Sequence, residues 1–360
     1  MGTKLGKNRL GERLRAARRL AGLSQRMVAH RVGLSAMAIS KYENGQMLPG
    51  SEVLLRLADA LGLEIEFFLR TATVHVEALA YRHHPKLSKR DREQAEAAAA
   101  EWIERFFEAE MLAGIRVVPD RFSRLPYAVK TMEDPEAAAE KLRRKWGLGT
   151  GPIASMVGLL EDHGVRVGII DLPEGADAMV FRIDGGAPVM VLRAGVLGDR
   201  QRFSMAHDLG HLVLSCDGEI NEESACHRFA AAFLVPAETA RRELGERRSE
   251  LSLLELHHLK STYGMSMAAW IKRSRELGIV SRHYARELLA RFRNEGWDLV
   301  EPGARVQPER PVRLEQIVIR LVHEGTIGSR RASELLGRPW EDFVHMRSED
   351  SGNLPVVAGL

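Results

Sequence analysis

Apolar residues recur at helical spacing from about residue 10 to residue 69 of the chain. Leu10, Leu14, Ala17 and Ala21 are three or four residues apart, which places them on one face of a helix, and Gly22 follows as a helix end. Further short apolar runs are separated by glycine and serine, and no alternating strand pattern interrupts them. We therefore predict five short helices that form a small all-α unit.

Serine residues precede three of these predicted helices. Ser24 stands before a helix that stops at Gly33, Ser35 before a helix over 36–43, and Ser51 before a fourth helix. A serine hydroxyl accepts a hydrogen bond from a backbone N–H of the first helical turn. We therefore expect all three serines to be N-caps.

The pattern changes further along the chain. A long helix rich in alanine and glutamate is predicted over 89–113. Runs rich in β-branched residues over 165–171, 178–183 and 188–194 are bounded by glycine, proline or aspartate, and they predict strands of one small sheet. Helical patterns then return from residue 200 onward. The expected fold class is mainly α with a small β-sheet (α+β).

A length of 360 residues suggests two or three domains. We predict a five-helix domain over 1–70, a helical linker region over 71–130, an α+β domain over 131–245 and a helical C-terminal region over 246–360.

The composition of the chain predicts the cellular compartment of the protein. No window approaches 18 consecutive apolar residues, and the first residues lack the apolar run of a signal peptide. Two cysteines, Cys216 and Cys226, cannot build a disulfide framework. We therefore expect a reduced, cytoplasmic protein with no membrane segment.

Positive charge is concentrated at the N-terminus. The net charge is +3, but residues 1–41 carry ten basic side chains against one acid, Glu12. Such an excess on a near-neutral body is typical of a module that binds phosphate groups, although a solvated basic arm has the same composition.

Residues 25–43 suit two helices that cross at a tight turn. A helix-turn-helix needs a small residue at the crossing and a turn residue that tolerates positive φ, and Ala29 and Gly33 supply both. The apolar residues expected to fill the core are Val28, Ile39, Leu54 and Leu57.

The second helix of this pair would present its N-terminal half to the major groove of DNA. Gln25 and Ser35 stand at helix N-termini, where backbone N–H groups also favour phosphate. The residues predicted to contact DNA are Gln25, Arg26, Ser35, Ala36, Met37, Ser40, Lys41 and Asn44.

The run S-Q-x-x-V-A-x-x-x-G-L-S-x-x-x-I-S-K-Y-E-N-G resembles the Xre helix-turn-helix domain of the Cro/cI repressor type. The resemblance covers about residues 9–69 and includes the terminal Tyr42-Glu43-x-Gly45. It implies binding to operator DNA. It also implies a homodimer, because such domains read two half-sites.

A second candidate site lies in the middle of the chain. His207 and His211 are four residues apart, so on a helix they share one face and can hold one metal ion. A third protein ligand is needed, and Glu223 on the following predicted helix is the best candidate. Its rivals by proximity are Glu222, Cys226 and His227. The alternative is that both histidines are ordinary core residues.

This stretch, taken with EESACHRFAAAFLVP, resembles the ImmA/IrrE metallopeptidase-like family. That family joins an H-E-x-x-H helix to a second helix of the pattern E-x-x-(A/C)-x-x-F-A. The resemblance covers about residues 130–300 and implies a zincin-like α+β fold. It also implies one zinc ion on His207, His211 and Glu223.

One position departs from the family. The glutamate that follows the first histidine is Asp208 here, which gives HDxxH in place of HExxH. As the candidate catalytic residue, Asp208 would accept a proton from metal-bound water. Its side chain is one methylene shorter, a retreat of roughly 1 Å, and misplacement on that scale can cost about a hundredfold in rate. Peptidase activity is therefore left open.

The sequence A-H-D-L-G-H also resembles the HD-domain phosphohydrolases, which bind metal through an adjacent His-Asp pair. Those folds need a further histidine on an upstream helix and an aspartate on a later helix. His163 is the only nearby upstream histidine, and after Asp217 no aspartate follows until Asp298. This reaction class is therefore disfavoured.

Together these features predict a transcriptional regulator that binds operator DNA and carries a zinc metallopeptidase-like domain. That domain would sense a signal or cleave a partner repressor. Two alternatives stay open. The chain is an active zinc endopeptidase localised by its DNA-binding module, or it is an antitoxin-like repressor that binds a toxin protein and has an inactive peptidase site.

Overall fold

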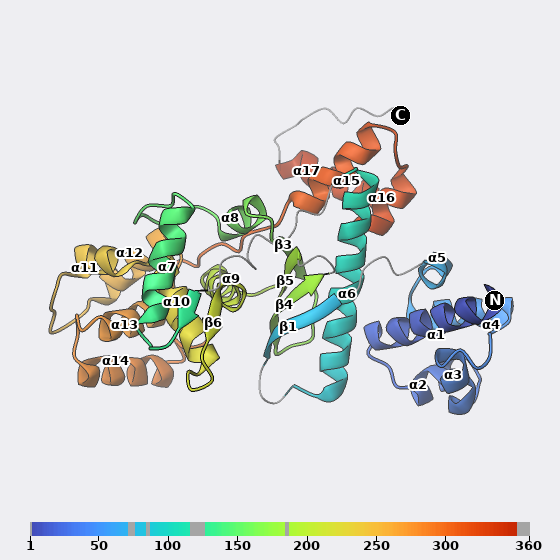
Figure 1. The fold of residues 1–360 in the computed structure, drawn as a ribbon, viewed down its shortest axis with the longest axis horizontal. Coiled ribbons are helices and arrows are strands. Elements are labelled where there is room, and N and C mark those ends of the chain that lie inside the picture. The colour runs from blue at the N-terminus through green and yellow to red at the C-terminus, as the bar shows by residue number, and fades with distance from the viewer. Residues whose placement is uncertain (1, 71–75, 84–86, 116–126, 184–186, 351–360) are drawn as a thin grey trace.

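The computed structural model describes residues 2–70, 76–83, 87–115, 127–183 and 187–350. This part of the chain is mainly helical with two small sheets, which confirms the predicted fold class. Figure 1 shows an N-terminal helical group, a central sheet with one long helix, a larger helical group around α9 and α10, and a C-terminal helical group at the upper end of the long helix.

The N-terminal group contains the five predicted helices. They surround one apolar core that includes Val28, Ile39 and Leu57, while Leu54 is half-buried at its edge. Gly33 has φ +67°, the left-handed conformation expected at the turn between the helix pair. The helices are α1 (Gly2–Leu20), α2 (Gln25–Arg31), α3 (Ala36–Glu43), α4 (Ser51–Leu61) and α5 (Ile65–Leu69).

Two of the three predicted serine caps are confirmed. The Ser24 hydroxyl accepts from Met27 N, and the Ser35 hydroxyl accepts from Ala38 N. The prediction for Ser51 is wrong, because α4 begins at Ser51 and its N-cap is Gly50. Gly50 follows a proline and takes the extended conformation that a cap requires, which moves the serine hydroxyl inside the first turn.

The central sheet has the strand order β1-β4-β5-β3. Neighbouring strands are antiparallel except β3 and β5, which run parallel. Alternate residues of β4 and β5 point to opposite faces, and both faces are buried. The strands are β1 (Val76–His83), β3 (Arg166–Ile170), β4 (Ala176–Ile183) and β5 (Ala187–Arg193).

One long helix, α6 (Lys89–Leu112), covers one face of this sheet. Its Trp102 and Phe106 pack with Met179 and Val189 of the central strands. The region 71–130, expected as a helical linker, therefore contributes both α6 and strand β1 to this layer. Residues 116–126 of that region lie outside the described part of the chain.

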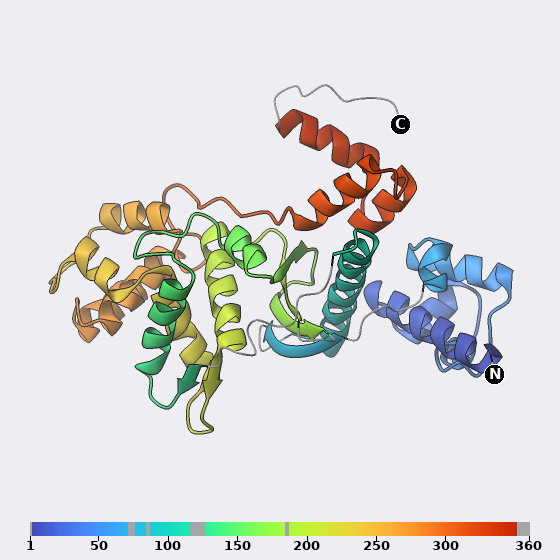
Figure 2. The same ribbon diagram turned by 45° about the horizontal axis from the view of Figure 1, so that its top comes forward.

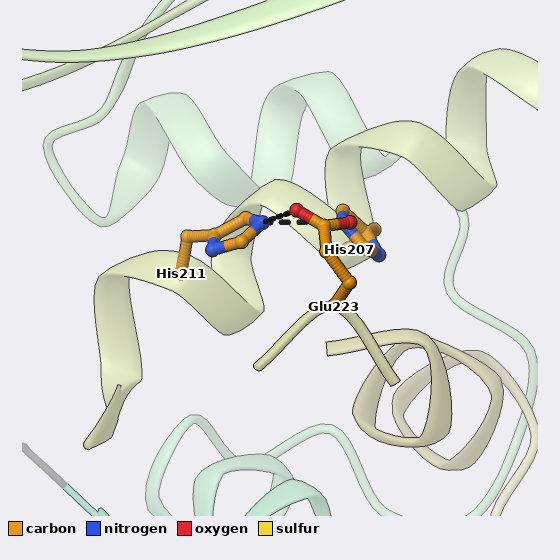
Figure 3. A group of neighbouring side chains, drawn as sticks. All are labelled: His207, His211 and Glu223. Atoms are coloured by element: carbon orange, nitrogen blue, oxygen red, sulfur yellow. Dashed lines mark hydrogen bonds and ion pairs between the residues drawn. The ribbon is translucent and has the colours of Figure 1, made fainter. Parts of the chain in front are cut away.

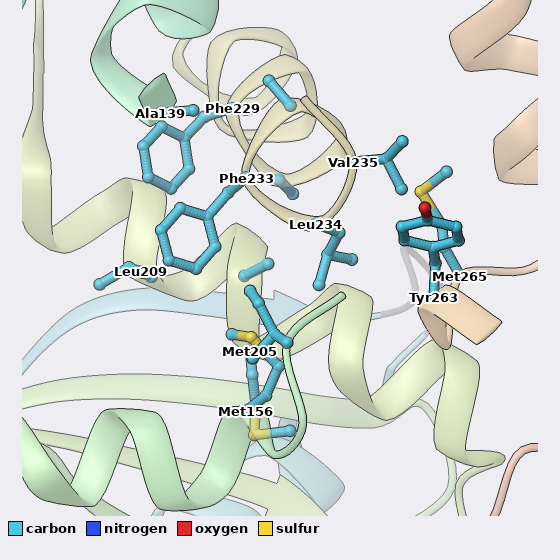
Figure 4. Packing of buried hydrophobic residues seen from close by; sticks show 14 of the residues in the cluster. Ala139, Met156, Met205, Leu209, Phe229, Phe233, Leu234, Val235, Tyr263 and Met265 are labelled. Atoms are coloured by element: carbon cyan, nitrogen blue, oxygen red, sulfur yellow. The ribbon is translucent and has the colours of Figure 1, made fainter. Parts of the chain in front are cut away.

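The opposite face of the sheet is covered by a second layer, whose core contains the contacting helices α9 and α10. Met205 and Leu209 of α9 face Phe229 and Phe233 of α10 there, and the two phenylalanine rings stack at 5.6 Å (Figure 4). The elements of this layer are β2 (Tyr127–Val129), α7 (Asp134–Lys145), α8 (Met156–Asp162), α9 (Gly198–Val213), β6 (Leu214–Cys216), α10 (Glu222–Leu234) and α11 (Ala237–Leu244).

The C-terminal helices form two separate groups (Figure 2). The first group joins the core around α10 and consists of α12 (Leu253–Tyr263), α13 (Met267–Glu276) and α14 (Arg282–Asn294). The second group packs on the end of α6 and consists of α15 (Arg313–His323), α16 (Ser329–Leu336) and α17 (Trp340–Asp350). None of the helices in the described ranges is both long and apolar enough to cross a membrane.

Candidate metal centre and DNA-contact surface

The contact between α9 and α10 creates the candidate metal centre. Gly210 of α9 lies directly against Cys226 of α10, and its missing side chain lets the two helices approach closely. This approach carries Glu223, in the first turn of α10, toward the two histidines of α9.

The three predicted ligands converge on one point (Figure 3). The Nε2 atoms of His207 and His211 lie 3.2 Å apart. One carboxylate oxygen of Glu223 lies 3.2 Å from the Nε2 atom of His207, and the other lies 3.5 Å from that of His211. His207 is completely buried, whereas the Glu223 side chain is 60% exposed, so the group opens to solvent on one side.

These distances fit a metal ion. Ligand atoms held at about 2.0–2.1 Å around a tetrahedral ion lie roughly 3.3–3.4 Å from one another. The two histidine nitrogens lie 3.2 Å apart, close to that value, and the two oxygens of Glu223 lie 3.2 Å from one nitrogen and 3.5 Å from the other. Two imidazole nitrogens and one carboxylate are also the donor set that such an ion accepts. The three residues form a group that could hold a metal.

The rival ligands Glu222, Cys226 and His227 lie around this group, and each takes a different position from Glu223. An oxygen of Glu222 lies 2.9 Å from Nδ1 of His211, on the side of the ring opposite the shared point. A carboxylate in this position fixes the tautomer and orientation of a metal-binding histidine. Glu222 was predicted only as a rival ligand, although the two consecutive glutamates were a visible signal of a second role.

His227 and Cys226 occupy different sides of the site. The ring of His227 lies 4.4 Å from that of His207, and its Nδ1 hydrogen-bonds the backbone oxygen of Glu223 at 2.7 Å. Cys226 can group with His211 and Glu222. Burial, followed by the nearby Glu222 carboxylate, raises the pKa of its thiol, which keeps the sulfur protonated at neutral pH.

Asp208, the predicted catalytic residue, is almost completely buried, with 2% of its surface exposed. It lies next to His207 in α9, and it belongs to neither group of possible ligands in the described chain. Glu223 is therefore exposed to solvent at this centre, whereas Asp208 is buried where α9 packs against its neighbours.

The predicted DNA-contact residues divide into two sets. The Met37 side chain is exposed, at 68%, whereas Ala36 and Ser40 are half-buried. The exposed set on α2, α3 and their ends consists of Arg26, Ser35, Met37, Lys41 and Asn44.

Gln25 differs from this set. Its amide nitrogen donates to the buried carboxylate of Glu43 at 2.9 Å, and Arg18 donates to the same carboxylate at 2.5 and 3.0 Å. The side chain of Gln25 therefore joins α2 to the end of α3 inside the domain. Asn44 also has an internal partner, because its side-chain oxygen accepts from Arg15 at 2.6 Å.

Two families match separate parts of the chain. The helix-turn-helix family matches residues 14–68, and the IrrE N-terminal-like domain of the M78 peptidase group matches residues 160–275. The chain carries a helix-turn-helix domain and an IrrE N-terminal-like domain. Both predicted resemblances are thereby confirmed. The IrrE-like match includes the α9–α10 contact and all three candidate ligands. No curated protein matches this chain.

Proposed function

We propose that this protein is a DNA-binding transcriptional regulator whose IrrE-like domain holds one zinc ion on His207, His211 and Glu223. The observation that carries the proposal is that the Nε2 atoms of His207 and His211 lie 3.2 Å apart and that each has an oxygen of Glu223 within 3.5 Å. Two histidines that only filled the core would not require a carboxylate from another helix beside both of their Nε2 atoms.

Zinc suits this donor set better than the common alternatives. Magnesium and calcium prefer sites made of oxygen, whereas zinc accepts imidazole and carboxylate together. Three protein ligands leave a fourth position, and the exposed side chain of Glu223 leaves room for solvent there. When bound in such a site, zinc lowers the pKa of a coordinated water toward about 7.

The chain's own residues supply the rest of the site. His207 is held by complete burial in the α9–α10 core, and His211 is oriented by Glu222. His227 lies against His207 at the open side, so a bound peptide or small effector would meet its ring. These features support a preformed site.

We infer that proteolysis is not the main use of this site. Asp208 has a shorter side chain than glutamate and is 2% exposed, so it is poorly placed to exchange a proton with solvent-side water. A metal-dependent sensor needs the ion and the fold but not that proton transfer. An active endopeptidase is the second candidate. The observation that favours it is the exposed side chain of Glu223, which leaves room for water at the fourth position of the ion.

The exposed face of α3 supports operator binding by the first domain. Lys41 can neutralise phosphate, and the methyl groups of Ala36 and Met37 suit contact with thymine. Two copies would read two half-sites, so we propose a homodimer on DNA in a reduced, cytoplasmic setting.

Metal analysis of the purified full chain, combined with genome-wide mapping of its DNA sites, tests the proposal. We expect about one zinc per chain and a limited set of discrete DNA sites. Glu223→Gln should lose most of the zinc, and Glu219→Gln, an exposed acid four residues earlier, should keep it. A chain that binds DNA sites but holds no zinc would contradict the metal centre, and zinc without discrete sites would contradict the regulator.

A further inference from the structure

The N-terminal part of α6 lies against the first domain, beside the turn that leads into α2. The side-chain amide of Gln94 donates to the backbone oxygen of Leu20 at 3.2 Å. A Cβ atom added at Gly22 would lie only 2.5 Å from the amide oxygen of Gln94, and Glu93 pairs with Arg19 of α1 at 3.7 Å. This contact ends two residues before the N-cap of α2, where the proposed DNA-contact surface begins.

Lys89 and Arg90 lie on the same face of α6, one turn closer to its N-terminus. They precede Glu93 and Gln94 by four residues, and residues four apart on a helix share a face. Both cations are exposed. In Figure 1 this end of α6 extends past α1 to the level of α2 and α3. The two cations therefore lie beside α2, on the side of the first domain that carries the proposed DNA contacts.

The first turn of α6 has a net positive charge. Residues 88–92 contain three cations and one acid, Asp91, whose carboxylate accepts from the Ser88 hydroxyl at 2.7 Å. The next acid, Glu93, is held by its ion pair with α1. Glu96 follows six residues after the second cation, roughly 9 Å further along the helix. Within the described residues, neither of the first two cations of α6 forms an ion pair.

This position of the two cations is unfavourable for α6 itself. The N-terminus of a helix carries partial positive charge, so acids stabilise the first turn and cations destabilise it. Helix α6 nevertheless begins with Lys89 and Arg90. Positions that break a local rule without a compensating contact are expected at functional sites. A phosphate group would be attracted by both side chains and by the partial positive charge of the helix end.

The arginines of α1 do not meet this need for positive charge beside α2, because three of them face acids within the protein. The pairs are Arg13 with Glu104, Arg18 with Glu43 and Arg19 with Glu93. Two of these acids belong to α6. Helix α6 therefore neutralises charge on α1 and presents cations of its own next to α2.

We propose that the first turn of α6 binds the phosphate backbone of DNA beside the half-site that α3 reads. Lys89 and Arg90 would each contact a phosphate of the flanking duplex, without regard to its base sequence. The protected DNA would then extend beyond the helix-turn-helix domain. This proposal rests on the proposed DNA-binding function, and it adds a contact from outside the domain that the helix-turn-helix family matches.

Fluorescence anisotropy with the full chain and a mapped DNA site tests this contact. Lys89→Gln/Arg90→Gln should weaken binding at least tenfold at about 0.15 M salt, and should lower the slope of log K against log salt concentration by about two units per bound chain. The loss should be the same when the flanking base sequence is scrambled. Lys141→Gln/Lys145→Gln removes two exposed cations from α7 and is the matched control, which should keep both affinity and slope.

Two further variants separate DNA contact from folding. Lys89→Glu/Arg90→Glu places acids at the helix N-terminus, so its melting temperature should be unchanged or higher, whereas its DNA affinity should fall below that of the glutamine variant. Lys89→Arg/Arg90→Lys keeps both charges and should bind like the unchanged chain. Trimming the duplex to the half-sites should remove the difference between the unchanged chain and the glutamine variant.

Full affinity and slope in the glutamine variant, or a loss that persists on trimmed duplexes, would overturn the α6 contact and leave the proposed function standing. A lower melting temperature of the charge-reversed variant would show that the two residues act through the fold, and would also overturn the contact. An unchanged chain that binds no discrete DNA site would instead overturn the proposed regulatory function, and the α6 contact with it.

Discussion

Gly210 and Cys226 are in direct contact where α9 meets α10. A Cβ atom at position 210 would lie 3.1 Å from the Cys226 sulfur and 3.2 Å from its Cα atom. A larger residue does not fit at these distances unless the Cys226 backbone moves. The separation of the two helices, and with it the position of Glu223 relative to the histidines, depends on this glycine.

Gly210→Ala should therefore weaken zinc binding while changing stability little. The gain in helix propensity, about 1 kcal/mol, would be offset by the crowding against Cys226. Zinc affinity, measured by competition with a chromogenic chelator, should fall about tenfold as Glu223 moves outward. Gly158→Ala is the matched control, since a Cβ there meets only Ser155 at 3.4 Å. An unchanged zinc affinity in the Gly210→Ala chain would show that the helix contact does not set the metal site.

Glu222 should matter to zinc affinity without being a ligand. Its carboxylate lies 2.9 Å from Nδ1 of His211, and loss of such a partner typically costs about 10–100-fold in metal affinity. Glu222→Ala is expected to fall in that range in the same chelator competition, whereas Glu223→Ala should abolish binding. Equal losses in the two variants would mean that Glu222 coordinates the ion directly.

Lys41 and Arg26 should act through the phosphate backbone of DNA. Both are exposed at the α2–α3 surface, and neither is committed to an ion pair within the described residues. Each alanine variant should weaken binding and lower the slope of log K against log salt concentration by about one unit. Arg286→Ala, far from this surface in the sequence, should keep the slope. An unchanged slope for Lys41→Ala would remove that residue from the contact surface.

Glu161 gives stability a pH dependence that can be measured. Burial raises the pKa of its carboxyl group to about 7, even though the backbone N–H groups of Arg313 and Val312 favour the charged form. The folded chain therefore holds this proton more tightly than the unfolded chain, and the stabilising effect is lost as pH rises toward and past 7. Glu161→Gln should raise the melting temperature relative to the unchanged chain at pH 8 and have little effect at pH 5.

The matched control for that comparison is Glu174→Gln, which alters an exposed glutamate. Its melting temperature should follow that of the unchanged chain at both pH values. An advantage of Glu161→Gln that is as large at pH 5 as at pH 8 would mean that the side chain acts by packing and not by holding a proton.

Substitution of Asp208 distinguishes a metal-dependent sensor from a peptidase. We expect the unchanged chain to cleave a quenched fluorescent peptide library no faster than background. Asp208→Glu restores the longer acid and should raise hydrolysis by up to about a hundredfold. Asp217→Glu, the same change at an exposed aspartate, should have no effect.

The opposite result would favour the enzyme. Hydrolysis by the unchanged chain that requires zinc and disappears in Asp208→Asn, with zinc content retained, would make the protein an endopeptidase. It would also show that a buried aspartate can act where the related family uses glutamate.

Local sequence signals were sufficient for the first domain. Serine caps and glycine ends placed the helix over 36–43 at the observed bounds, and Gly33 has the expected positive φ. The error at Ser51 arose because a glycine before it could serve equally well as the cap. The hydrogen bond of Gln25 to Glu43 could not be predicted, because the partner lies 18 residues away and is buried only after the domain folds.

Spacing was also sufficient to predict that His207 and His211 lie together, since residues four apart on a helix share a face. Glu223 was predicted from its place on the following helix and from the family resemblance. The contribution of Glu222 needed the actual orientation of the His211 ring. Strand β1 was missed because its partner β4 lies about a hundred residues away, and the region around it lacks clear alternation.

X-ray absorption at the zinc edge of the full chain is the most direct test of the metal centre. We expect a first shell of nitrogen and oxygen atoms at about 2.0–2.2 Å, with the multiple-scattering pattern of two imidazoles and no sulfur. A sulfur atom at about 2.3 Å would instead place the ion on Cys226 with His211 and Glu222, and would contradict the assignment of His207 and Glu223.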